Sequence, residues 1–227
     1  MLIINFLNNV TNINNKFIEN IPKNKVKYYN ISNFGINISN EQKKYIEKCT
    51  IDANDKLFNL PTLIHNKNFE LHTNFWNFCV NPEGSMFNLP YTLNNVIFLP
   101  ISIIHSNNLT QTLIHERIHI LQRYNVDNWL NYIEKNTIWK KLDYCYCEEY
   151  LNTLIKPKII IKNPDVSLNQ FSYKNYIAFF ALDINTNIVN LQWFYIDNNK
   201  KIIKFNDNLL KYEHPFEYYA YYYQDKL

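Results

Sequence analysis

The stretch TLIHERIHILQRY, residues 112–124, contains two histidines four positions apart, His115 and His119, with Glu116 directly after the first. The random expectation for H-E-x-x-H in a chain of this composition is on the order of 0.01, so chance is a poor explanation for it. On an α-helix the two histidines lie about one turn apart and roughly 40° from each other, so both imidazoles can reach one metal ion. Glu116 is displaced by about 100° from His115, where a base can take a proton from a metal-bound water. The stretch therefore predicts a helical metal centre with an adjacent general base.

Apolar side chains occupy both flanks of this predicted helix: Leu113, Ile114, Ile118, Ile120 and Leu121. We therefore expect the helix to be largely buried. Two neutral histidines and a glutamate would be costly inside a protein without partners, and metal ligation removes that cost.

Gln122 lies near the histidine face of the helix, about one turn after His119, and is a candidate to hydrogen-bond a ligand or the substrate. A surface glutamine is an equally good interpretation. The alternative for the whole motif is a pair of satisfied core histidines, with Glu116 paired to Arg117 or Arg123.

The arrangement resembles the zincin metallopeptidases, in which a catalytic zinc has three protein ligands and an open position for water. A metzincin would continue with Gly at 122 and His or Asp at 125, whereas this chain has Gln122 and Asn125. In the glutamate-type zincins, or gluzincins, the third ligand is a glutamate on a later helix, often in an E-x-x-A setting. The tail EHPFEYYAY, residues 213–221, contains Glu217-Tyr-Tyr-Ala220, which matches that setting.

The resemblance implies that His115, His119 and Glu217 bind one Zn²⁺ ion and that Glu116 is the general base. Pro215 suits the first turn of the tail helix, and the small Ala220 allows close helix packing. The resemblance covers residues 110–124 and 213–221, and loosely the strand before the H-E-x-x-H helix. The separation of His119 from Glu217 in the sequence is longer than in the compact members of the family.

Several other residues remain open as the third ligand, and Glu217 has the alternative of a surface carboxylate. These residues are Glu213, His214, Glu148, Glu149, Asp127 and Asp143. Because zincins often support the transition state with a Tyr or His, the resemblance also marks Tyr221 and His214 as candidate substrate or transition-state contacts.

The predicted fold class is α+β and zincin-like, with a mixed sheet whose edge strand lies beside the H-E-x-x-H helix. The edge strand is assigned to Asn95–Leu99, where a peptide substrate could add by main-chain hydrogen bonds; a plain central strand is the alternative. We predict one metallopeptidase-like domain over residues 1–227. It comprises an N-terminal mixed region (1–107), the active-site helix with the helices after it (108–156), and a β-meander with the ligand-bearing helix (157–227).

Periodicity and capping residues predict the individual elements. Strands are expected at Met1–Leu7, Val26–Ile31, Glu70–Val80, Asn95–Pro100, Ile159–Lys162, Tyr176–Asp183, Ile188–Ile196 and Lys201–Phe205. Helices are expected from Ser39 to about Cys49, from about Thr110 to Tyr124, and over Asp127–Lys135, Ile138–Leu154 and Glu213–Gln224.

Composition excludes several function classes. Net charge is +3 and the lysine clusters are short, so no nucleic-acid footprint is indicated. The two glycines argue against a Gly-rich phosphate loop.

The opening residues lack the features of a signal peptide, and no run approaches the roughly 18 apolar residues of a membrane span. The four cysteines form no CxxC pair and suit reduced thiols, which favours an intracellular, cytoplasmic protein or a virion protein. Abundant Asn, Ile, Lys and Tyr share AT-rich codons and would fit a large DNA virus or an AT-rich protist.

The sequence therefore predicts a zinc metallopeptidase that hydrolyses a peptide or protein substrate, with no nucleic-acid or membrane partner. Oligomeric state is left open. The rival hypothesis is a non-catalytic structural or virion-associated protein that retains a zincin scaffold as an interaction module.

Overall fold

The computed structural model describes residues 2–10, 35–58, 74–143, 146–166, 170–207 and 209–227. The expected strand at 26–31 lies outside these residues. The chain divides into two compact units, Met1–Asn125 with Ala220–Leu227, and Val126–Tyr219. Both contain helices and strands, which confirms the α+β class. The single-domain assignment and its internal boundaries stay predictions.

The first unit contains a four-stranded mixed sheet in its described part, in the order β1-β2-β4-β3. β1 with β2 and β2 with β4 are parallel pairs, whereas β3 with β4 is antiparallel, so the predicted mixed sheet is confirmed. The elements are β1 (Ile3–Phe6), β2 (Phe75–Asn81), the 3₁₀ turn η1 (Ser85–Asn88), β3 (Tyr91–Leu93), β4 (Val96–Pro100) and the 3₁₀ turn η2 (Ile101–Ile103).

The assignment of the sheet edge to Asn95–Leu99 is wrong. β4 is hydrogen-bonded on both sides, and all five of its residues are buried, as is usual for a continuous apolar run in a sheet interior. Within the described residues the terminal strands are β1 and β3, and β3 pairs with β4 alone and contacts helix α5 (Leu109–Tyr124).

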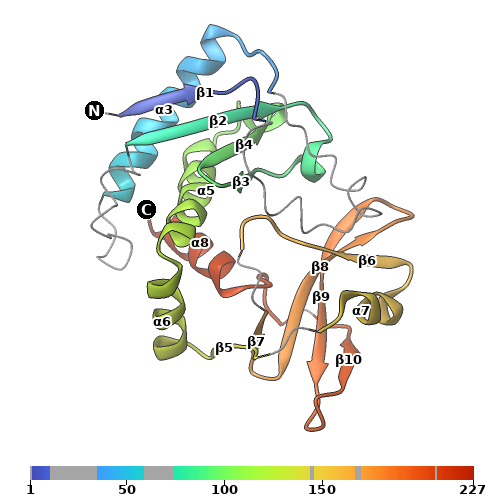
Figure 1. Cartoon of the computed structure of the whole chain (residues 1–227). Helices are drawn as coiled ribbons and strands as arrows, with labels where there is room; N and C mark the ends of the chain where they lie inside the picture. The colour runs from blue at the N-terminus through green and yellow to red at the C-terminus, as the bar shows by residue number, and fades with distance from the viewer. Residues whose placement is uncertain (1, 11–34, 59–73, 144–145, 167–169, 208) are drawn as a thin grey trace. The chain divides into compact units, whose positions relative to one another are not determined.

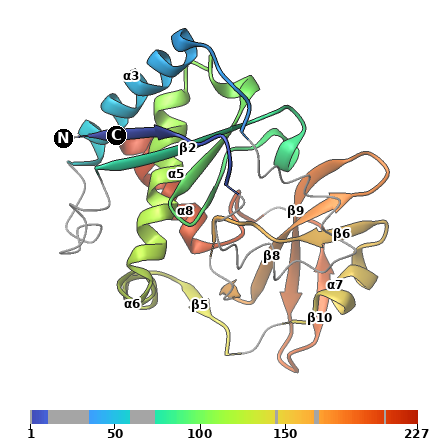
Figure 2. The same ribbon diagram turned by 45° about the horizontal axis from the view of Figure 1, so that its top comes forward.

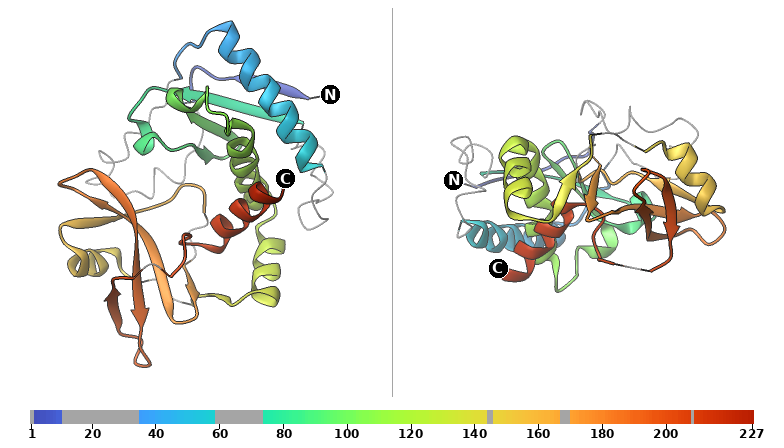
Figure 3. Two further views of the ribbon diagram at one scale, coloured as in Figure 1. Left: turned by 180° about the vertical axis from the view of Figure 1, so that it is seen from behind. Right: turned by 90° about the horizontal axis from the view of Figure 1, so that it is seen from below.

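Two helices, α3 (Asn40–Leu57) and α5, lie side by side on one face of this sheet (Figures 1 and 3). α3 begins at the predicted cap residue but runs well beyond the predicted end at Cys49. The reason is that buried residues continue at helical spacing through Ala53 and Leu57. α5 confirms the helix predicted from the quoted stretch.

The start of α3 is a capping box. The Ser39 hydroxyl accepts from the Gln42 backbone N–H at 3.1 Å, and the Ser39 backbone N–H donates to the Gln42 Oε1 at 2.9 Å. Ser39→Ala removes one of these bonds and is expected to lower the free energy of unfolding by about 1 kcal/mol in urea denaturation. Lys48→Ala, an exposed change on the same helix, is the control and should stay within about 0.5 kcal/mol of the parent. An equal effect of both variants would contradict the capping role.

The second unit contains a curled antiparallel sheet in the order β10-β9-β8-β7-β5, with β6 paired to β8. β8 pairs along its whole length with residues 188–195 of β9, and β10 follows β9, so the predicted β-meander is confirmed (Figure 2). The elements are α6 (Val126–Asn136), β5 (Trp139–Lys141), α7 (Glu148–Ile155), β6 (Lys158–Ile161), β7 (Phe171–Tyr173), β8 (Tyr176–Asp183), β9 (Ile188–Ile196) and β10 (Ile202–Phe205).

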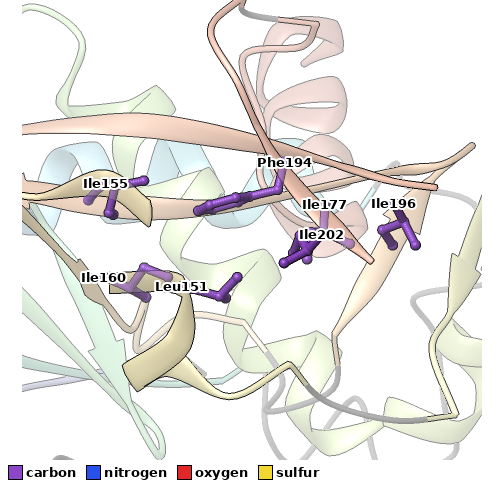
Figure 4. Close-up of a cluster of buried hydrophobic side chains, with 8 residues drawn as sticks. Leu151, Ile155, Ile160, Ile177, Phe194, Ile196 and Ile202 are labelled. Atoms are coloured by element: carbon purple, nitrogen blue, oxygen red, sulfur yellow. The ribbon is translucent and has the colours of Figure 1, made fainter. Parts of the chain in front are cut away.

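The core of the second unit lies between α7 and the sheet. Figure 4 shows its buried side chains converging from the helix and from four strands. The cluster comprises Leu151, Ile155, Ile160, Ile177, Ala181, Phe194, Ile196 and Ile202. Alternate residues of the strands point to this face, as the period of two in the sequence predicts.

Only the second half of the helix expected over Ile138–Leu154 is confirmed, as α7 (Glu148–Ile155), and its predicted start at Ile138 is wrong. Trp139–Lys141 forms β5, which pairs with β7, and α7 begins only at Glu148. Both strands have three residues, too few for a period to identify, and pairing between distant segments overrides local helical preference. β7 was not predicted for the same reason.

The last helix, α8 (Pro215–Lys226), confirms the predicted tail helix with Pro215 in its first turn. In its first half, Phe216 and Tyr219 pack against Trp129 of α6, with ring centroids 6.3 and 5.6 Å apart. Over the part of the chain that the structure describes, no helix is both long and apolar enough to cross a membrane.

Candidate metal centre

The two histidines of α5 face each other inside the protein. His115 is 8% exposed and His119 is fully buried, and their Nε2 atoms lie 3.0 Å apart. Two nitrogens bound to one tetrahedral zinc at bonds of about 2.0–2.1 Å would be separated by roughly 3.3 Å. The helical spacing of four therefore brings both imidazoles to a distance that a single ion can bridge.

Gln122 fixes the orientation of His119. Its Oε1 lies 3.0 Å from His119 Nδ1, and Gln122 itself is fully buried, so the surface-glutamine interpretation is wrong. A carboxamide oxygen only accepts, which places the ring proton on Nδ1 and the lone pair on Nε2, the atom facing His115. Such outer partners normally hold metal-binding histidines in place. A contact of Gln122 with substrate stays a prediction.

Glu217 completes the group. One ligand atom from each of His115, His119 and Glu217 lies within 4.8 Å of the others, and all three residues are buried. Among the described residues, it is the one group of three or more His, Cys, Asp or Glu side chains that could hold a metal ion. Two imidazoles and one carboxylate suit zinc and other first-row divalent ions.

The alternative third ligands have other partners. Glu213 accepts the Phe180 backbone N–H at 2.9 Å through Oε2. His214 Nδ1 accepts the Phe216 backbone N–H at 3.1 Å, so His214 caps α8.

The remaining alternatives also lie outside the group. Glu148 pairs with Lys162 at 3.4 Å, and Glu149 accepts from the Cys147 thiol at 2.8 Å. Asp127 and Asp143 are described residues as well, and neither belongs to the group. The geometry thus favours Glu217 as the third ligand.

Glu116 is adjacent to His115 in the sequence, and Tyr221 contacts the His115 ring. Glu116 follows His115 on α5 and is 2% exposed. The Tyr221 ring packs edge-on against His115, with centroids 4.4 Å apart, and is 39% exposed. Because Tyr221 lies four residues after Glu217, both project from the same side of α8.

The two arginines of α5 are bound to the sheet of the first unit. Arg117 donates to the Phe75 carbonyl at 3.0 Å and stacks over the Trp76 ring at 4.9 Å, and burial lowers its pKa to about 10. Arg123 donates to the carbonyls of Thr92 and Asn94 at 3.0 and 3.1 Å.

Asn163, in the loop after β6, was missed by sequence reasoning. Its Nδ2 donates to Glu217 Oε1 at 2.8 Å, and its Oδ1 accepts the Asp165 backbone N–H at 2.9 Å. Asparagine is abundant in this chain, so no local signal distinguishes this one.

Burial raises the pKa of Glu213 well above its ordinary value of 4.5, and the nearby carboxylates of Glu217 and Asp165 add to the effect. The folded state therefore holds a proton that the unfolded chain releases. The protonated Glu213 carboxyl contributes its full stability at pH values below the pKa of Glu213 in the unfolded chain. This contribution is lost as pH rises through the pKa of Glu213 in the folded protein.

Glu213→Gln removes this dependence while keeping an acceptor for the Phe180 N–H. In chelator-treated protein, the variant is expected to have a Tm several degrees above the parent at neutral pH. The difference should vanish as pH falls toward the unfolded-state value of 4.5. Differential scanning calorimetry across pH checks this, with the exposed Glu134→Gln as control. A Tm difference that does not change with pH would contradict the assigned cause.

No protein-family model matches the sequence, and no curated protein and no solved structure shows a significant match to this chain.

Proposed function

We propose that this protein is a zinc-dependent metallopeptidase, a divergent gluzincin in which His115, His119 and Glu217 hold one zinc ion. The observation that carries the proposal is the buried group of three ligand atoms within 4.8 Å, with Glu116 directly after the first histidine. Catalytic zinc sites keep three protein ligands of this kind and an open position for water.

The residues fit the ion on three counts. The two Nε2 atoms converge at 3.0 Å, Gln122 holds one of the rings, and all three donors are buried. When bound, zinc would polarise the scissile carbonyl and lower the pKa of a coordinated water to about 7.

The chain's own residues would perform the proton transfers. Glu116 would accept a proton from the attacking water and deliver it to the leaving amine. Tyr221, which packs against His115, would donate a hydrogen bond to the oxyanion of the transition state.

The terminal strand β3, which contacts α5, would accept an extended peptide by strand addition. β3 therefore replaces the interior strand β4 as the proposed site of strand addition. Arg123 already holds the Thr92 carbonyl of β3, so peptide binding would compete with that contact.

The test begins with metal content. Protein purified without chelator is expected to contain about one zinc per chain and to hydrolyse a fluorescently labelled unfolded protein. Removal of zinc with a chelator should abolish hydrolysis, and stoichiometric zinc should restore it. Absence of bound metal at neutral pH would refute the site. Stoichiometric zinc without hydrolysis of any unfolded substrate would favour the non-catalytic interaction protein.

A further inference from the structure

We propose that Asn163 is a positioning residue of this centre, which holds the Glu217 carboxylate in the orientation that binds the metal. The inference rests on the proposed function and adds a residue that lies on neither α5 nor α8. Its basis is the 2.8 Å hydrogen bond from Asn163 Nδ2 to Glu217 Oε1.

The orientation of the Asn163 amide is set from both sides. The Asp165 backbone N–H can only donate, so the atom 2.9 Å from it must be the Asn163 oxygen. The amide N–H₂ then faces Glu217, whose Oε1 must accept. A turn of the loop after β6 thus aims a donor at one oxygen of the carboxylate.

Glu217 needs such a partner because of its surroundings. It is 7% exposed and lies near the buried carboxyl group of Glu213, which is 8% exposed and also has Asp165 (7% exposed) as a neighbour. Glu213 accepts the Phe180 backbone N–H and also interacts with the Asn163 side chain. The 2.8 Å hydrogen bond from Asn163 Nδ2 goes to Glu217 Oε1, and a hydrogen bond to one oxygen disfavours ligation through both. The remaining position stays open for water, as catalysis requires.

The contact between Asn163 and Glu217 is similar to the contact between Gln122 and His119 on α5. Gln122 holds His119 through a neutral amide, and Asn163 holds Glu217 in the same way. Loss of an outer-shell partner typically weakens metal binding 10–100-fold. We therefore expect Asn163 to contribute to zinc affinity by about one to two orders of magnitude.

The test measures the zinc dissociation constant of the full chain by competition with a chromophoric chelator. Asn163→Ala should weaken zinc binding by about 10–100-fold. Asn163→Ser should weaken it equally, because the hydroxyl can still accept the Asp165 N–H but is too short to reach Glu217. Asn152→Ala is the matched control: Asn152 accepts the Ile160 backbone N–H at 2.6 Å, so its loss should affect stability and leave zinc affinity unchanged.

A double-mutant cycle with Glu217→Ala shows whether Asn163 acts through Glu217. In that background Asn163→Ala should change zinc affinity by less than about twofold, because the group it positions is gone. Wild-type affinity in Asn163→Ser, or an equal loss from Asn163→Ala in both backgrounds, would overturn the inference. If Glu217→Ala itself leaves zinc affinity unchanged, the proposed metal centre fails instead.

Discussion

Glu116→Gln is expected to lower kcat/KM for an unfolded-protein substrate by about 10²–10⁴-fold while leaving one zinc bound per chain. The carboxamide has the shape of the carboxylate but cannot accept a proton. Because Glu116 is 2% exposed and lies outside the three-residue ligand group, an isosteric change should preserve the packing and the ligands. Steady-state hydrolysis and zinc content, measured on the same preparation, check both parts of the expectation.

Glu134→Gln makes the same chemical change at an exposed position of α6 and should leave both quantities unaltered. Full hydrolysis by Glu116→Gln would place the base elsewhere. Loss of zinc from that variant would assign Glu116 to holding the metal or the fold.

Glu217→Ala is expected to weaken zinc binding by more than about 100-fold, beyond the cost of losing an outer-shell partner. The reason is that two histidines of one helix remain, and a catalytic site ordinarily needs a third protein ligand. Chelator competition measures the dissociation constant, and loss of hydrolysis at limiting zinc should accompany it.

Glu213→Gln is the matched comparison, since it changes a buried carboxyl group four residues earlier in the chain. We expect its zinc affinity to stay close to that of the parent. The reverse pattern, with Glu213→Gln losing zinc and Glu217→Ala retaining it, would transfer the third-ligand role to Glu213.

Much of the fold was predictable because its signals are local. The bounds of β8 and β9 follow from runs of eight and nine residues rich in β-branched and aromatic side chains, separated by an Asn-Thr-Asn turn. The start of α3 follows from Ser39 and its capping partner, which lie three residues apart. Elements of three residues, such as β5 and β7, carry no comparable signal and were missed.

The order of strands was less accessible. The apolar run Val96–Pro100 identifies a strand but does not say which strands flank it. Its interior position depends on pairing with Phe75–Asn81 and Tyr91–Leu93, and only the folded sheet specifies both partners. The edge was therefore assigned to the wrong strand.

The sequence by itself determined the His115–Glu116–His119 constellation, because positions four apart on any α-helix meet at one side. It also marked Glu217 through the E-x-x-A pattern, but only as one of several carboxylates. The tertiary structure favours Glu217, the one carboxylate found grouped with both histidines among the described residues, and it alone revealed the hydrogen bond from Asn163 to Glu217. The physical reason is that helical geometry acts over a few residues, whereas contacts between distant segments depend on how whole surfaces pack.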